Sequence, residues 1–222
     1  MDFMKLLKSL DDFLYEVVGW IVFYPITFIR SVLNPVEMLR YSDRELLEPD
    51  DEQYTDTFNP PIFLLTTLLI ASLLGKVIQP QIKLSGLLSK DTDVLLFRGV
   101  VFSIFPVLMA VDLLKHQGKR IDRVALRPLF YGQCFIAAPF ALVASIAGLL
   151  VEFQKVPYVI AGLLIFLVAF CWYVAVEVIW FSSTLNVTKV RATCHVLVVV
   201  LLANVLVILA ALGIQYASKH AS

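Results

Sequence analysis

The chain has 222 residues, of which 59% are hydrophobic and 16% charged, whereas soluble domains are about 45–50% apolar and about 25% charged. Its 18 Lys and Arg residues equal its 18 Asp and Glu residues, so no overall charge favours a nucleic-acid partner. The apolar residues fall in long blocks, which favours one membrane-embedded unit over one or two soluble domains.

Residues 1–17 have the pattern of an amphipathic helix. The apolar residues recur at three- and four-residue steps: Phe3, Leu6, Leu7, Leu10, Phe13, Leu14 and Val17. The other helical face carries Lys5, Lys8, Asp12 and Glu16. This pattern predicts a helix in the plane of the membrane interface, held by apolar insertion. The basic start and the cleavage site of a secretory signal are not present in this segment.

Residues 17–33 are apolar except for Arg30, short for a span, rich in aromatic residues and interrupted by Pro25. These features favour a kinked interfacial or re-entrant helix. The alternative is a sixth span, which would place the first 15 residues on the opposite side of the membrane.

Two capping patterns follow, at Asn34-Pro35-Val36-Glu37 and at Ser42-Asp43-Arg44-Glu45. They predict two short helices, followed by an acidic tether that ends the N-terminal region 1–56. The tether carries Glu48, Asp50, Asp51, Glu52 and Asp56.

The rest of the chain, residues 57–222, is predicted to be a transmembrane domain. Its spans are expected at about 57–78, 94–114, 128–151, 156–181 and 195–217, because each run has the length and apolar composition of a membrane-crossing helix. The predicted fold class is therefore an all-α integral membrane protein, a five-helix transmembrane bundle with an N-terminal amphipathic or re-entrant helical region.

The distribution of cations among the loops predicts the orientation. Lys115, Lys119, Arg120, Arg123 and Arg127 lie between the second and third spans, and Lys189 and Arg191 follow the fourth. Loops on the other side carry Lys83, Lys90 and Lys155, offset by Asp91, Asp93 and Glu152. By the positive-inside rule, the N-terminus is expected to be cytoplasmic and the C-terminus extracytoplasmic.

Two proline-containing segments carry a family resemblance. Asn34-Pro35-Val36-Glu37-Met38-Leu39 precedes the tether, and Phe58-Asn59-Pro60-Pro61-Ile62-Phe63-Leu64 opens the first span. With five closely spaced spans behind them, this layout resembles the Yip (Rab-GTPase-interacting protein) superfamily, especially its short bacterial members. The resemblance implies a membrane-shaping, scaffold or transport-accessory role; the eukaryotic branch binds Rab-type GTPases in vesicle traffic. The compact loops favour a bacterial inner membrane, with the Golgi or endoplasmic reticulum as the alternative.

Polar residues within or beside the spans are candidate functional groups, because ionisable side chains are costly in lipid. Glu177 and Asp112 are expected near the cytoplasmic interface, as structural charges paired with Arg127, Lys189 or Arg191; the alternative is a proton or substrate site. Asn204 and Gln133 are expected to hydrogen-bond neighbouring helices.

The third span carries small residues at helical spacing, Ala137, Ala141, Ser145 and Gly148. Small residues let helices approach closely, so an intramolecular packing face is predicted, with a homodimer or partner interface as the alternative. The basic loop (Lys115, Lys119, Arg120, Arg123 and Arg127) would attract anionic lipid headgroups or fold against the acidic stretch 43–56.

No catalytic, cofactor or metal site is predicted. The three cysteines (Cys134, Cys171 and Cys194) have no metal-binding spacing, and His116, His195 and His220 are expected to lie apart. The predicted function is that of a non-enzymatic scaffold, accessory subunit or membrane organiser. Its partners would be the bilayer and other membrane proteins or a second copy of the chain. A transporter, channel or lipid-translocating component is the alternative, and a membrane enzyme comes third.

Overall fold

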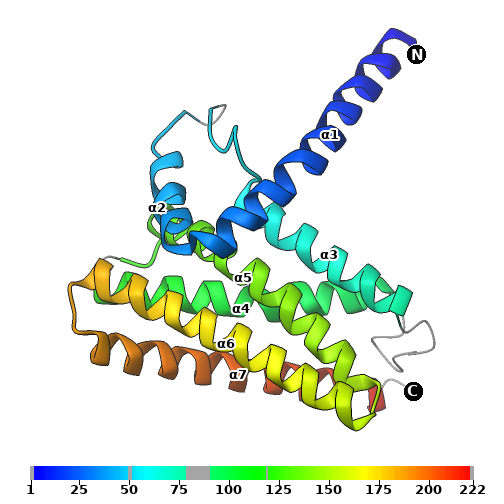
Figure 1. Ribbon diagram of the computed structural model, residues 1–222. Helices are drawn as coiled ribbons and strands as arrows, with labels where there is room; N and C mark the ends of the chain where they lie inside the picture. Colours follow the sequence, from blue (N-terminus) through cyan, green and yellow to red (C-terminus); the bar gives the residue numbers. More distant parts are fainter. Residues whose placement is uncertain (1–2, 50–51, 79–90, 119, 221–222) are drawn as a thin grey trace.

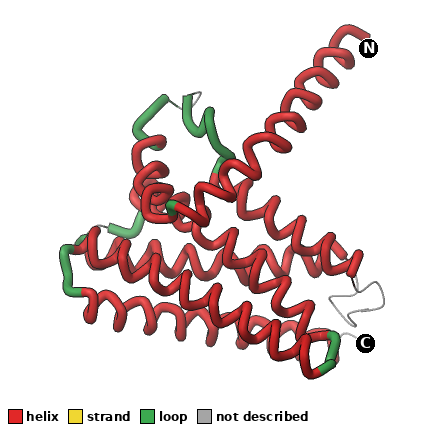
Figure 2. Tube along the Cα trace, in the orientation of Figure 1, coloured by secondary structure: helices red, strands yellow, loops and turns green. Residues whose placement is uncertain are grey.

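The structure is a computed structural model that describes residues 3–49, 52–78, 91–118 and 120–220. The described residues form seven α-helices and no strand (Figures 1 and 2). The helices are α1 (Phe3–Leu33), α2 (Pro35–Glu45), α3 (Pro60–Ile78), α4 (Asp91–His116), α5 (Arg123–Glu152), α6 (Val156–Leu185) and α7 (Lys189–His220). The predicted all-α fold is confirmed.

The N-terminal region differs from the predicted pair of separate segments. α1 is one helix of 31 residues that continues through Pro25. A proline in a helix interior removes one backbone hydrogen bond, yet helical structure continues on both sides of Pro25. The C-terminal part of α1 packs on α5 and α2, and the N-terminal part extends away from the bundle (Figure 1).

α2 is also a single helix, so the prediction of two short helices in this segment is wrong. Pro35 takes the first helical position as expected, although the Asn34 side chain forms no capping hydrogen bond. Ser42, which was expected to cap a second helix, lies inside α2 and is fully buried. Burial of α2 against α5 favours one continuous helical face over a break at Ser42.

α5 is the central helix of the bundle. It contacts α1, α2, α3, α4 and α6, and α7 packs on α4 and α6. In its most apolar stretch 56% of the residues are buried, against 22–28% in the other long apolar helices. α5 and α6 approach each other closely, because a Cβ atom at Gly162 would lie 2.6 Å from the Ala147 carbonyl oxygen.

The helix ends explain why two helices are longer than the predicted spans. α5 begins at Arg123 because the Asp122 side chain accepts a hydrogen bond from the Ala125 amide (2.8 Å). α6 continues to Leu185 and ends at Asn186, whose φ of 51° is left-handed.

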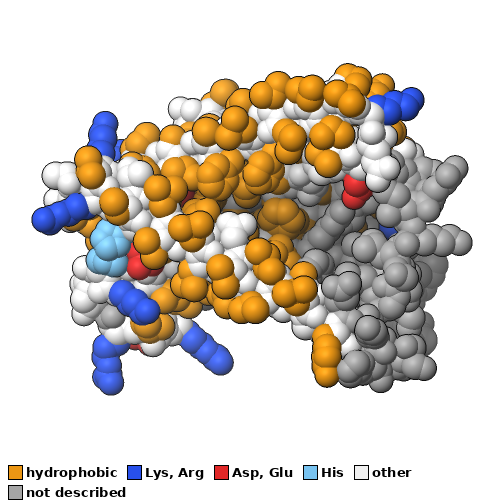
Figure 3. Space-filling model, turned by 90° about the horizontal axis from the view of Figure 1, so that it is seen from below, with side chains coloured by type: hydrophobic (Ala, Val, Ile, Leu, Met, Phe, Trp, Pro, Cys, Tyr) orange, Lys and Arg blue, Asp and Glu red, His pale blue; other side chains and the backbone are white. Residues whose placement is uncertain are grey.

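Five helices (α3, α4, α5, α6 and α7) are long and apolar enough to cross a membrane. Their outward faces are apolar, with Val168 70% and Leu201 66% exposed. Figure 3 shows one such face, mostly hydrophobic, with most of its Lys and Arg side chains at one end. Apolar surface of this extent is a liability in water and a requirement in lipid. The chain is an integral, multi-pass membrane protein.

Candidate functional site

The most extensive polar cluster joins α1, α2 and the segment that leads into α3. We call this cluster the junction and define it by Thr27, Arg30, Tyr41, Tyr54, Asp56 and Thr57. The Thr27 hydroxyl is buried and accepts a hydrogen bond from the Phe58 amide at 2.9 Å. This contact holds the C-terminal part of α1 against the chain just before α3.

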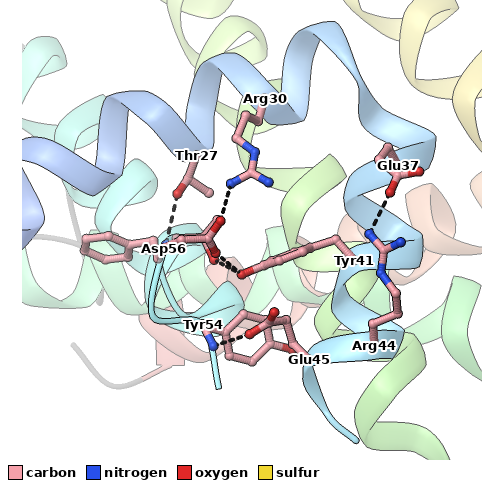
Figure 4. Close-up of polar contacts among 10 residues, drawn as sticks. Thr27, Arg30, Glu37, Tyr41, Arg44, Glu45, Tyr54 and Asp56 are labelled. Atoms are coloured by element: carbon pink, nitrogen blue, oxygen red, sulfur yellow. Dashed lines mark hydrogen bonds and ion pairs between the residues drawn. The ribbon is translucent and has the colours of Figure 1, made fainter. Parts of the chain in front are cut away.

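A carboxylate at the centre of the junction has two donors (Figure 4). The Arg30 guanidinium lies 3.0 Å from Asp56 Oδ2, and the Tyr41 hydroxyl donates to Asp56 Oδ1. Since the single Tyr41 proton goes to Asp56, the Thr57 hydroxyl at 2.9 Å donates to the Tyr41 oxygen. The Arg30 guanidinium also lies 5.2 Å from the centre of the Tyr41 ring. Three chain segments are thus joined through one charged group.

Tyr54 closes the other side of the junction in a left-handed conformation, with φ 57°. Its amide donates to Glu45 Oε2, and its hydroxyl lies 3.2 Å from the Ser42 hydroxyl (Figure 4 labels Tyr54 and Glu45). A non-glycine residue adopts this φ at a cost that the surroundings must offset. The offset here comes from a ring that is only 6% exposed and from the two contacts to α2.

Aromatic rings pack beneath these polar groups. The Tyr24 ring contacts the rings of Phe28, Phe58 and Phe63, while the Tyr41 and Tyr54 rings both contact Phe135 of α5. Ring pairs of this kind add about 0.5–1.5 kcal/mol each beyond the area they bury. Apolar packing of these rings therefore holds the three segments of the junction together, and the hydrogen bonds set how the segments are oriented.

The junction shifts the pKa values of its own groups. Burial raises the pKa of Asp56, but the hydrogen bonds from Tyr41 and Arg30 and the charge of Arg30 outweigh it, so the net pKa is lowered. Burial raises the pKa of Tyr54 to about 12. Burial and the hydrogen bond to Asp56 also raise the pKa of Tyr41. At neutral pH the junction is an ionised carboxylate held by a cation and a neutral phenol.

A second polar cluster lies inside the bundle. Glu177 of α6 is fully buried, and its Oε2 atom accepts a hydrogen bond from Gln133 Nε2 of α5 at 3.0 Å. Gln133 thus joins a neighbouring helix as expected. The expected pairing of Glu177 with Arg127, Lys189 or Arg191 is not seen; its hydrogen-bond partner among the described residues is the Gln133 amide. The Gln133 Oε1, Tyr173 hydroxyl and Glu177 Oε1 atoms are buried without hydrogen-bond partners.

Asp112 lies near the C-terminal end of α4, half-buried and beside a histidine. Its Oδ1 atom is 3.6 Å from His116 Nδ1. The His116 ring is in turn 4.3 Å, centre to centre, from the His195 ring of α7. The expectation that the histidines lie apart is therefore wrong for this pair, because the ends of α4 and α7 are neighbours in the bundle.

Asn204 does not join a neighbouring helix, contrary to expectation. Its Nδ2 atom donates to the Val200 carbonyl, one turn earlier in α7 (2.8 Å). The side chain also lines a cavity of about 350 Å³ between α4, α5, α6 and α7, together with Ser145, Gly148 and Glu152. Aromatic residues make up much of the remaining lining.

The small residues of α5 have different environments. Ala137 and Ala141 are buried in the bundle, and Ser145 is half-buried. Gly148 is exposed, and a Cβ atom there would have no other atom within 4 Å, so it is not at a close helix contact. The close contact is instead at Gly162 of α6.

The basic loop is only partly described. Lys119 lies outside the described residues, as do Lys83 and Lys90 of the loop after α3. Lys115, Arg120 and Arg123 are exposed, and Arg127 stacks on the Tyr131 ring at 5.3 Å. The acidic stretch does lie nearby, because Asp43 and Arg123 line the same pocket. A polar contact between the two segments joins the Arg127 guanidinium to the Gln53 amide oxygen at 3.5 Å.

Comparison of the chain with family models, with curated proteins and with solved structures finds no match. Sequence reasoning missed the junction, because its residues come from three segments and none is a transmembrane residue. The one available signal was Arg30, the single charge in the apolar segment 17–33, which needs a partner such as Asp56 at the end of the acidic tether.

Proposed function

We propose that this chain is a non-enzymatic membrane scaffold or accessory subunit. In this proposal the five-helix bundle is the base, and the first half of α1, residues 3–16, is an arm that engages the membrane interface and a neighbouring membrane protein or second copy. The observation that carries the proposal is the contrast along α1. One end is locked by Thr27 and Arg30, and the other extends beyond the bundle (Figure 1).

The sequence of the arm supports this role. Its apolar face, with Leu6, Leu10 and Phe13, is of the kind that inserts into an interface or packs on another helix. A helix fixed at its base presents that face in one direction, which reduces the entropy lost on binding. A Yip-like scaffold role, suggested by the layout of the chain, belongs to the same proposal.

The size of the native assembly in mild detergent tests the proposal. Replacing Leu6, Leu10 and Phe13 by Ser should reduce the assembly to a single chain, while the thermal stability of the bundle is unchanged. Replacing Lys5 and Lys8 by Ser, on the opposite helical face, is the matched control and should leave the assembly intact. A wild-type protein that runs as a single chain, or equal sizes for both variants, would contradict the proposal.

The proposed orientation has a cytoplasmic N-terminus, in a bacterial inner membrane. It is supported by the cations at the α4–α5 and α6–α7 ends of the bundle. A cysteine at exposed Ile121 should resist an impermeant thiol reagent in intact cells, and a cysteine at Ser218 should react. Labelling at residue 121 but not at residue 218 would show that the orientation is the opposite of the proposed one.

A transport function is the second candidate, and the cavity beside Asn204 favours it. Its lining combines aromatic residues with Ser145, Asn204 and Glu152, which suits a lipid chain or a small amphiphile. Reconstituted wild-type protein should then move lipid or solute, and filling the cavity with Ser145→Leu and Asn204→Leu should stop it. Absence of movement in the wild type would leave the scaffold proposal as the better account.

A further inference from the structure

A cluster of possible metal ligands lies at the end of the bundle where α4 ends and α7 begins. Asp112 and His116 are four residues apart on α4 and therefore share one helical face. His195 faces them from α7. One ligand atom from each of the three side chains lies within 4.8 Å of the other two. Figure 3 shows the pale-blue histidines next to a red acidic side chain at this end of the molecule.

The histidine on α4 is oriented as metal-binding histidines usually are. His116 Nδ1 lies 2.8 Å from the backbone carbonyl oxygen of Asp112. With the proton on Nδ1 donated to this carbonyl, Nε2 keeps its lone pair and the ring orientation is fixed. A backbone hydrogen bond of this type orients the ligand and selects its tautomer in known metal sites.

Asp112 supplies an independent observation. Its Oδ2 atom is buried and has no hydrogen-bond partner in the structure. The other oxygen lies 3.6 Å from His116 Nδ1, which is longer than a hydrogen bond. A buried carboxylate oxygen without a donor is costly, and a bound cation would remove that cost.

We propose that Asp112, His116 and His195 form a binding site for a divalent transition-metal ion of the Zn²⁺ class. Two imidazole nitrogens and one carboxylate are a donor set typical of such ions. Ligands at about 2.0–2.2 Å from zinc must lie roughly 3–4 Å apart, so the site closes with small side-chain rotations. Water would complete the coordination, because His116 is exposed.

The ion would connect α4 to α7, which pack against each other in the bundle. Lys115 and Arg191 are exposed nearby and lower the affinity through repulsion. Two neutral imidazoles and one carboxylate carry a net single negative charge, which attracts the ion. The alternative to a metal site is a plain contact between two histidine rings with a loose ion pair to Asp112.

Zn²⁺ titration of the full-length protein in nanodiscs, after treatment with a chelator, tests the site by calorimetry. We expect one ion per chain in the wild type. Loss of an outer-shell partner alone costs about 10–100-fold in affinity, so His116→Ala and His195→Ala should each weaken binding at least about tenfold. His220→Ala, near the other end of α7, is the matched control and should bind as the wild type does.

Two further measurements keep the test independent of folding. Zn²⁺ should raise the unfolding temperature of the wild type and leave that of His195→Gln unchanged, because glutamine fills similar space without a ligand nitrogen. Co²⁺ should give visible absorption bands in the wild type that His116→Ala lacks. Equal Zn²⁺ affinity in wild type, His116→Ala and His195→Ala, or no binding to the wild type, would overturn the proposal.

Discussion

The junction and the bundle interior bury polar groups in opposite ways. In the junction, Asp56 has two donors and Tyr41 is both a donor and an acceptor. In the interior, one hydrogen bond joins Gln133 to Glu177, and an oxygen of each stays without a partner. In the junction, the polar groups fix the position of α1. In the bundle interior, the unpaired oxygens lower the stability of the fold.

This difference matches the surroundings of the two regions. The charged pair of the junction is partly open to water, with the Arg30 side chain 39% and the Asp56 side chain 60% exposed, so this ion pair keeps part of its hydration. The interior is held by close packing, as at Gly162, and its polar pair contributes little to that packing. We therefore expect packing changes to affect the bundle and hydrogen-bond changes to affect the position of α1.

The largest expected effect is at the contact of α5 with α6. Gly162→Leu places a side chain where a Cβ atom alone would be 2.6 Å from the Ala147 carbonyl oxygen. Because that atom is backbone, the two helices must separate, at a cost of about 3 kcal/mol or more. The variant should show a much lower unfolding temperature in detergent, or no folded protein.

Gly148→Ala is the matched control, since a Cβ atom there meets nothing within 4 Å. It should be neutral or stabilise the protein by up to about 1 kcal/mol through reduced backbone entropy. A Gly162→Leu protein as stable as Gly148→Ala would show that the helices are not in close contact.

The second effect is smaller and confined to the junction. Tyr41→Phe keeps the ring but removes the hydroxyl that joins Asp56 to Thr57. The loss should be about 1–2 kcal/mol of docking free energy for α1. Hydrogen exchange should become faster in residues 20–33 while the bundle helices keep their protection. Tyr158→Phe, at an exposed ring, is the control; uniform acceleration along the whole chain would contradict the local role.

Glu177→Gln should change the unfolding free energy by less than about 1 kcal/mol, because an amide fits the same space and can still pair with Gln133. A pH-jump flux assay in proteoliposomes separates this structural role from a transport role. Flux in the wild type that disappears in Glu177→Gln would contradict the scaffold proposal.

The smallest effect is the pH dependence of the junction. The pKa of Asp56 is lowered from its ordinary value of 3.8 when α1 docks. The ionised Asp56 therefore stabilises the docked α1 fully at pH values above its unfolded pKa. This stabilisation is lost as the pH falls through the lower pKa of the folded state. Acidification below about pH 4 should speed proteolysis near Arg30 in the wild type but not in Asp56→Asn. If the proteolysis rate depended on pH in the same way in the wild type and in Asp56→Asn, Asp56 would not be the group responsible.

The five spans could be predicted because each is a continuous apolar block, and composition alone decides such helices. The length of α5 needed one further local signal, the Asp122 cap, and the end of α6 needed the left-handed Asn186. Both are short-range features that the hydropathy of a segment does not contain.

The candidate site could not be predicted in the same way, because it depends on contacts between distant segments. Thr27 meets Phe58, and His116 meets His195, only after the helices have packed. Glu177 was expected at an interface from its distance to the span end, but the extension of α6 and its packing on α5 bury it. Pro25 was expected to interrupt or kink the helix over residues 17–33, and the structure has one helix from Phe3 to Leu33 with Pro25 inside it.

The central claim is that the junction holds α1 at a fixed direction relative to the five-helix base. Double electron–electron resonance measures this directly, with spin labels at the exposed positions Ser9 on α1 and Val190 on α7, in a background lacking native cysteines. A single narrow distance distribution is expected for the wild-type junction. It should broaden when Tyr41→Phe and Asp56→Asn are combined. A broad distance distribution with the wild-type junction, or the same distribution in the double variant, would contradict the claim.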